Sequence, residues 1–133
     1  EITMDQAMKG VQAGVAKAKE LNSPSSIAVV DSGRNLLAFA RMDGALLASI
    51  EISQGKAYTA RSLNLKTSQV SEFVQPGAPL YGLETTHRQP LVVFGGGVPV
   101  TRGDTVIGAV GVAGGTTDDD EAIATAVAEV IGG

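Results

Sequence analysis

Two pairs of short apolar runs, each joined by a turn of only a few residues, most strongly limit the folds open to this chain. The first pair is Ile27–Val30 and Asn35–Arg41, separated by the turn Asp31–Arg34. The second pair is Val98–Thr101 and Thr105–Ala113. Turns this short join antiparallel neighbours, because a parallel connection needs a crossover of about a dozen residues or more. The sequence therefore predicts a mostly antiparallel sheet.

Helical periodicity marks both ends of the chain. Apolar residues recur every three or four positions from Met4 to Ala18, and Thr3 with Gln6 fits a capping box at the start of that helix. The same spacing predicts a last helix over Asp118–Val130, whose first acidic residues complement the helix dipole. These terminal helices are expected to cover the sheet.

The middle of the chain supplies two more helices and a third strand. The helices are predicted over Ala45–Asn64 and Ser68–Phe73, and the strand is predicted over Leu91–Phe94. A long irregular stretch runs from Gln75 to Pro90. The predicted order is α-β-β-α-α-β-β-β-α, which is typical of an α+β domain of two or three layers. We find no internal repeat and no linker, so residues 1–133 are expected to form a single domain.

Composition excludes several classes of function. Ten Lys and Arg residues against 14 acids give a net charge of −4, which disfavours binding to nucleic acid or to an anionic membrane. The chain has no Cys, so disulfides, thiolate metal sites and Cys nucleophiles are ruled out, and a single His makes a protein-built metal site unexpected. We expect a cytoplasmic protein, with secretion left open because the sequence starts at Glu1.

The end of the second apolar run carries a charged pair, Arg41 and Asp43, followed by Gly44. The planar fork of Arg41 could hold a carboxylate. Asp43 could act as an acid or base, or it could simply pair with Arg41 and cap the next helix. Lys56 lies within that helix among small residues. It could supply a positive charge to an anionic ligand, or it could be an ordinary solvated lysine.

The irregular stretch and the turn after it supply the remaining candidates. His87 could act as a base or ligate a haem iron, or it could be an ordinary loop histidine. The run Gly95, Gly96 and Gly97 leaves backbone uncovered, so that a ligand or a second chain could approach closely.

Six segments that occur in order along the chain carry a family resemblance. They are Val29–Gly33, Arg41–Ala45, Lys56–Ala60, Gly95–Val100, Val106–Gly115 and Asp119–Ala126. Together they resemble the haem-binding-protein and GlcG-like family, which includes the C-terminal domain of the propanediol-utilisation cobalamin adenosyltransferase. The resemblance covers about Met4 to Val130. It implies a profilin-like fold with a five-stranded antiparallel sheet, homo-oligomers and, in some members, haem binding.

The first functional interpretation is therefore an oligomeric protein that binds haem or a related anionic tetrapyrrole. Arg41 and Lys56 would hold carboxylates over the bare backbone of Gly95–Gly97. The N-terminal helix lacks the histidine that relatives place there, so the axial ligand would be His87, Tyr58, Tyr81 or a methionine.

The alternative interpretation is a small-molecule enzyme, a lyase, isomerase or hydrolase acting on a carboxylated metabolite. Arg41 would bind the carboxylate, Lys56 or His87 would move a proton, and Asp43 would orient one of them. Both interpretations depend on Arg41 and Lys56 converging on one hollow.

Overall fold

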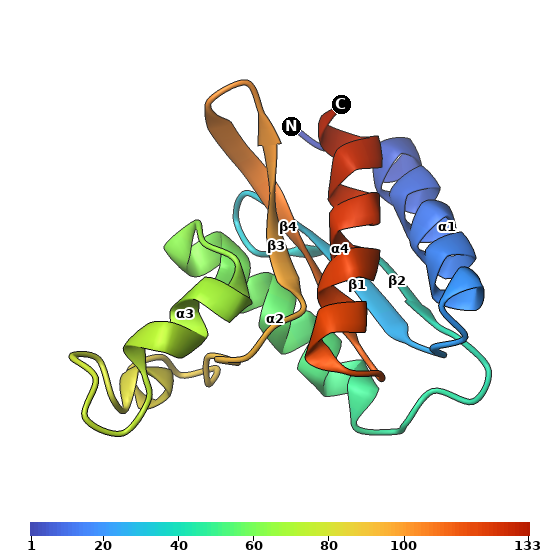
Figure 1. Cartoon of the computed structure of the whole chain (residues 1–133). Coiled ribbons are helices and arrows are strands. Elements are labelled where there is room, and N and C mark those ends of the chain that lie inside the picture. The colour runs from blue at the N-terminus through green and yellow to red at the C-terminus, as the bar shows by residue number, and fades with distance from the viewer.

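The computed structural model describes residues 1–133 and is built around the two predicted hairpins (Figure 1). The elements are α1 (Met4–Glu20), β1 (Ser26–Asp31), β2 (Leu36–Arg41), α2 (Ser49–Leu63), α3 (Thr67–Phe73), the 3-10 turn η1 (Leu83–Thr85), β3 (Gly97–Arg102), β4 (Thr105–Ala113) and α4 (Thr117–Gly132). The predicted capping box is confirmed at the start of α1. There the Thr3 hydroxyl accepts from the Gln6 N–H at 3.1 Å, and the Gln6 side chain accepts from the Thr3 N–H at 2.9 Å.

The four strands form one antiparallel sheet in the order β2-β1-β4-β3. Each hairpin supplies one central strand, and β1 pairs with β4 along its whole length, from Ser26 opposite Ala113 to Asp31 opposite Gly108. The central strands are almost wholly buried, whereas β2 at one edge is half-exposed. The antiparallel character predicted from the turns is thus confirmed.

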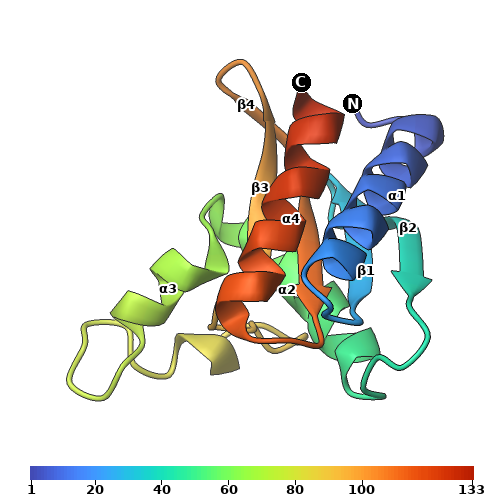
Figure 2. The same cartoon turned by 45° about the vertical axis from the view of Figure 1, so that its right-hand side comes forward.

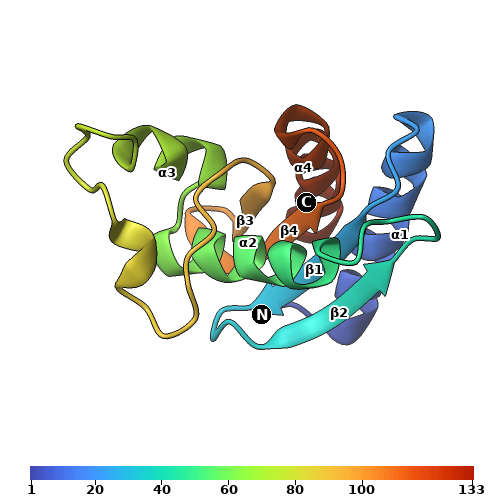
Figure 3. The same cartoon turned by 90° about the horizontal axis from the view of Figure 1, so that it is seen from below.

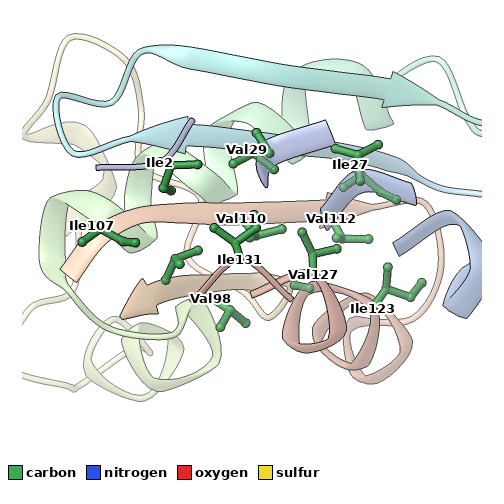
Figure 4. Packing of buried hydrophobic residues seen from close by; sticks show 14 of the residues in the cluster. Ile2, Ile27, Val29, Val98, Ile107, Val110, Val112, Ile123, Val127 and Ile131 are labelled. Atoms are coloured by element: carbon green, nitrogen blue, oxygen red, sulfur yellow. The ribbon is translucent and has the colours of Figure 1, made fainter. Parts of the chain in front are cut away.

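Helices cover both faces of this sheet, so the molecule has three layers (Figures 2 and 3). Helices α1 and α4 lie side by side on one face, and α2 crosses β4, β1 and β3 on the other. Between α1, α4 and the sheet, aliphatic side chains such as Ile27, Val112 and Val127 form the main core (Figure 4). The main core holds no aromatic side chain, whereas Phe39 packs against the smaller cluster formed by Ala28, Val30, Ala57, Ala60 and Ala109.

Glycine in β4 brings α2 very close to the sheet. A Cβ on Gly111 would overlap the carbonyl oxygen of Ser53 and lie 2.5 Å from the Ala57 nitrogen. The helix therefore packs its own backbone against the strand, and the adjacent residue Lys56 is drawn into the interior.

The strand predicted over Leu91–Phe94 is absent, so the prediction of a five-stranded sheet is wrong. In this segment the Leu91 N–H donates to the Glu84 carbonyl at 3.2 Å, and the Val92 N–H donates to the Thr59 hydroxyl at 2.8 Å. The backbone of this segment therefore bonds to a loop and to α2. It does not pair with β3, which remains an edge strand of the sheet. An apolar run of four residues is compatible with either outcome, because the pattern does not specify what its backbone will bind.

The segment from α3 through η1 extends to one side of the sheet (Figure 1). No helix is long and apolar enough to cross a membrane. No three His, Asp or Glu side chains gather in a cluster suited to a metal ion.

Candidate functional site

The residues singled out from the sequence fall in three separate places. Arg41 and Asp43 lie beside α1, Lys56 lies in the interior near the glycine run, and His87 lies over the far half of α2. Tyr81 is 69% exposed in the stretch before η1 and lines none of these places.

Lys56 is inserted into the protein between α2 and the carboxyl end of β4. Its side chain is 1% exposed. The Nζ atom donates to the Val112 carbonyl at 2.8 Å and to Asp120 Oδ2 at 3.1 Å, and it lies 5.1 Å from the centre of the Phe94 ring. Desolvation lowers the pKa of the Lys56 ammonium from its ordinary 10.5, and the charge of Asp120 offsets part of this effect.

Asp120 comes from the first turn of α4, where a carboxylate also complements the helix dipole. Its Oδ1 atom accepts from the Gly115 N–H at 3.0 Å, so both oxygens are engaged. The lysine and the aspartate therefore form a buried ion pair whose polar atoms are well satisfied.

The glycine run packs against this pair. Gly96 has φ of +129°, and a Cβ there would lie 2.6 Å from Lys56 Nζ. The Gly96 carbonyl accepts from the Val112 N–H at 2.9 Å, and the Gly97 N–H donates to the Thr67 hydroxyl at 2.8 Å. The backbone left bare by Gly95–Gly97 is buried and is covered by the protein's own groups.

Beside the ion pair lies a pocket of about 190 Å³, which we call the Lys56 pocket. It is lined by Leu46, Ala48, Ser49, Ile52, Lys56, Phe94, Ala113, Gly114, Gly115, Thr117 and Asp120. No His, Tyr or Met side chain lines it. The pocket is also smaller than the roughly 300–1,000 Å³ typical of ligand sites.

Arg41 lies in a different pocket, the α1–β2 groove, which has a volume of about 370 Å³. The groove is lined by Val15, Lys19, Ala40, Arg41, Met42 and Asp43. Three of these are apolar, and the two cations Lys19 and Arg41 have no carboxylate within ion-pair distance. The groove therefore combines an apolar wall and a thioether with two positive charges and one carboxylate, Asp43, which forms no ion pair with either cation.

Within one chain, the prediction that Arg41 and Lys56 face a shared hollow is wrong. Arg41 ends the edge strand β2 and lines the α1–β2 groove, whereas Lys56 projects from α2 and lines the Lys56 pocket, which shares no residue with that groove. The enzyme interpretation needs Arg41, Lys56 and His87 at one site, and the single chain does not assemble that site.

His87 borders a third pocket, of about 210 Å³, which we call the polar hollow. It is lined by Ser32, Arg34, Arg61, Ser62 and His87, and by no hydrophobic residue. Tyr58 lies next to it, with its ring edge-on to the His87 ring at 6.1 Å. Neither side chain lines the α1–β2 groove or the Lys56 pocket.

Sequence reasoning missed Lys19, Arg34 and Arg61. Lys19 could have been found, because it follows Val15 by four positions and so shares a helix face with it. The two arginines carry no local pattern, since one lies in a turn and the other in a helix 27 positions later.

The comparisons with known proteins cover nearly the whole chain. Residues 2–129 match the protein family described as haem degrading protein, HbpS-like. An uncharacterised 15.0 kDa protein of Citrobacter freundii, from the dhaT-dhaS intergenic region, is 50% identical over 123 residues. These make up 92% of this chain and 87% of that protein.

Two crystal structures share the fold. Protein ORFY of Klebsiella pneumoniae is 42% identical with a TM-score of 0.94, over 98% of this chain and 90% of that one. A complex of PduOC with haem is 34% identical with a TM-score of 0.93, over 98% of this chain and 95% of that one.

Proposed function

Because the chain belongs to the haem degrading, HbpS-like family, we propose that it binds haem or a closely related anionic tetrapyrrole in the α1–β2 groove. The family resemblance carried by the six ordered segments is confirmed by this membership and by the likeness to PduOC in its haem complex. The proposal for this chain depends on what lines the groove.

The observation that carries the proposal is the pair of unpaired cations beside an apolar wall, which outnumber the one carboxylate of the groove, Asp43. Haem presents two carboxylates at one edge of a flat apolar ring. Lys19 and Arg41 would hold the carboxylates, and Arg41 could do so with two parallel hydrogen bonds. Val15 and Ala40 would contact the ring, and the groove volume of about 370 Å³ lies within the usual range for ligand sites.

Met42 is the axial-ligand candidate that lies in the groove. A methionine thioether is an established haem ligand, whereas His87, Tyr58 and Tyr81 lie elsewhere in the chain. Haem, when bound, supplies a redox-active iron. The protein's own contribution would be to orient the ring through the two cations and to keep water from its inner face.

The predicted homo-oligomer belongs to the same proposal. Lys19, Arg41 and Asp43 are all exposed, so the groove is open to solvent on one side. A ring bound there would leave apolar surface uncovered, and a second copy of the chain could cover it.

Titration of the purified chain with hemin, followed by the Soret band, tests this function. We expect a shifted band, with binding weakened about tenfold or more in Lys19→Ala/Arg41→Ala, because charge-assisted contacts are lost. Lys9→Ala removes an exposed lysine of α1 outside the groove and is the matched control. The absence of a shift, or a shift that the double substitution leaves unchanged, would overturn the proposal.

The variant Met42→Leu tests the axial ligand separately. Leucine has nearly the same volume, so the groove should keep its shape and most of its affinity. We expect the absorption maxima of the bound haem to move. Unchanged maxima would exclude Met42 as an iron ligand.

A further inference from the structure

A second candidate site is the polar hollow, which the haem proposal does not use. We propose that it binds an oxyanion of the phosphate type, either free phosphate or the phosphate group of a small ester. Its lining comes from the turn between β1 and β2, from the C-terminal half of α2 and from the loop after η1, which come together on one side of the molecule (Figure 3).

The positive charge of the hollow is not neutralised by the protein. Arg34 and Arg61 both line it, in a chain whose net charge is −4. The only ion pairs in the structure are Lys17–Glu20 and Lys56–Asp120, so neither arginine has a carboxylate within 4.0 Å. Two guanidinium groups facing one small cavity repel each other unless an anion lies between them.

The arginines also retain unused donors. Arg61 Nη1 donates to Asn64 Oδ1 at 2.8 Å, but its Nε atom is buried without a hydrogen-bond partner. The Nη2 groups of Arg34 and Arg61 form no hydrogen bond within the protein and remain free to donate to a ligand. The other buried side-chain atom without a partner, Glu84 Oε1, forms no ion pair with either arginine.

Arg34 is held in place before any ligand arrives. Its Nη1 atom donates to the Ser62 hydroxyl at 3.1 Å, and that hydroxyl donates to the Tyr58 carbonyl at 2.7 Å. Its guanidinium lies 4.6 Å from the centre of the Tyr58 ring, which also meets His87 edge-on. Tyr58 therefore positions a cation and an imidazole at the same time.

The backbone at Arg34 is strained in a way that favours this arrangement. Arg34 has φ of +68°, a conformation that bulky residues rarely adopt. The turn is fastened by Asp31, whose Oδ1 atom accepts from the Gly33 and Asn35 N–H groups, both at 2.9 Å. Asp31 thus accepts hydrogen bonds from backbone N–H groups of the turn, while Arg34 lines the hollow.

The donor set indicates phosphate in preference to a carboxylate. Two guanidinium groups and the Ser32 hydroxyl supply donors from the β1–β2 turn and from α2. A carboxylate has two oxygens in one plane, whereas a phosphate has up to four in a tetrahedron, which suits donors from separate segments. The hollow, at about 210 Å³, has room for a small anion and a few waters.

The test is calorimetric titration of the purified chain with inorganic phosphate, with a simple phosphate monoester and with acetate. We expect phosphate to bind, with shifts in the backbone amide NMR signals of Ser32–Asn35, and acetate to bind at least about tenfold more weakly. Binding of the monoester as well would identify an esterified ligand, and exclusion of it would identify the free ion.

Substitutions at Arg34 and Arg61 make the test specific, and Arg61→Ala removes the second guanidinium of the hollow. Arg34→Gly suits the left-handed backbone, so the turn should still form while the guanidinium is lost. Arg34→Lys keeps the charge without the planar fork. We expect each to weaken phosphate binding about tenfold or more, and Lys9→Gln, which removes one charge from α1, to leave it unchanged. Circular dichroism checks that each variant folds. Absence of phosphate binding, or binding that Arg34→Gly and Arg61→Ala leave unchanged, would overturn the proposal without affecting haem binding.

Discussion

Lys56 Nζ lies 3.1 Å from Asp120 Oδ2, and the two side chains are 1% and 3% exposed. They stand 64 positions apart in the sequence and come from helices on opposite faces of the sheet. The pair therefore links α2 to α4 past the carboxyl end of β4. Because burial of two charges is favourable only when both remain paired, the structure around them should respond strongly to the loss of one.

The ion pair predicts strong coupling between its two members. Asp120→Ala leaves a buried ammonium without its partner, so we expect a loss of about 3–5 kcal/mol in the free energy of unfolding. Lys56→Met/Asp120→Ala should lose less than the sum of the two single variants. Urea unfolding of the four proteins measures the coupling. The exposed pair Lys17 and Glu20 is the control, with an expected coupling below about 1 kcal/mol. Equal coupling in both pairs would contradict the prediction.

Asp31 predicts a dependence of stability on acid pH. The hydrogen bond from the Asn35 backbone, with smaller contributions from the Asn35 side chain and the Gly33 backbone, lowers the pKa of this carboxyl from 3.8. The folded state therefore releases the proton more readily than the unfolded state. The stabilisation is fully present above the unfolded pKa and is lost as the pH falls through the lowered folded pKa.

The measurement for Asp31 is the difference in unfolding free energy between the wild-type chain and Asp31→Asn across the acid range. We expect the wild-type advantage to be constant above about pH 5 and to shrink as the carboxyl is protonated. An advantage that does not vary with pH would show that the ionised form is not the one that fastens the turn.

We expect the Thr67 hydroxyl to stabilise the backbone around Gly97. The Thr67 side chain is fully buried and accepts from the Gly97 N–H at 2.8 Å. Thr67→Val keeps the shape but leaves that N–H without a partner, so we expect a loss of about 1–3 kcal/mol in unfolding free energy. Thr67→Ser keeps the acceptor and should lose less. A smaller loss for valine than for serine would contradict the account.

Gly111 predicts the effect of one added methyl group. In Gly111→Ala the methyl would overlap the Ser53 carbonyl oxygen, and helix backbone cannot yield as a side chain can. We expect a loss of about 3 kcal/mol or more in thermal or urea unfolding. In the control Gly33→Ala, the methyl would meet side-chain atoms alone, Asn35 at 2.9 Å and Asp31 Oδ1 at 3.4 Å, so the loss should stay within about 1 kcal/mol. Similar losses in both variants would refute the close approach of α2 to β4.

Elements that depend on nearby residues were predictable from the sequence. The strand Thr105–Ala113 was predicted with the bounds that the structure has, and the hairpins, the capping box of Thr3 and the terminal helices are present. The strand predicted over Leu91–Phe94 is absent, because its backbone bonds to Thr59 and Glu84 instead of to a neighbouring strand. Whether this segment forms a strand therefore depends on hydrogen-bond partners such as Thr59, which lies 33 positions away in the chain.

The sequence by itself determined the two hairpins, the terminal helices, the antiparallel sheet and the family, since periodicity, short turns and ordered segments are local features. Only the tertiary structure decided which charges meet. It placed Arg41 and Lys56 at two pockets with no residue in common, paired Lys56 with Asp120, and brought Arg34 and Arg61 to the same hollow. The physical reason is that an unpaired or buried charge is defined by its neighbours in space, and the packing of helices on the sheet selects those neighbours.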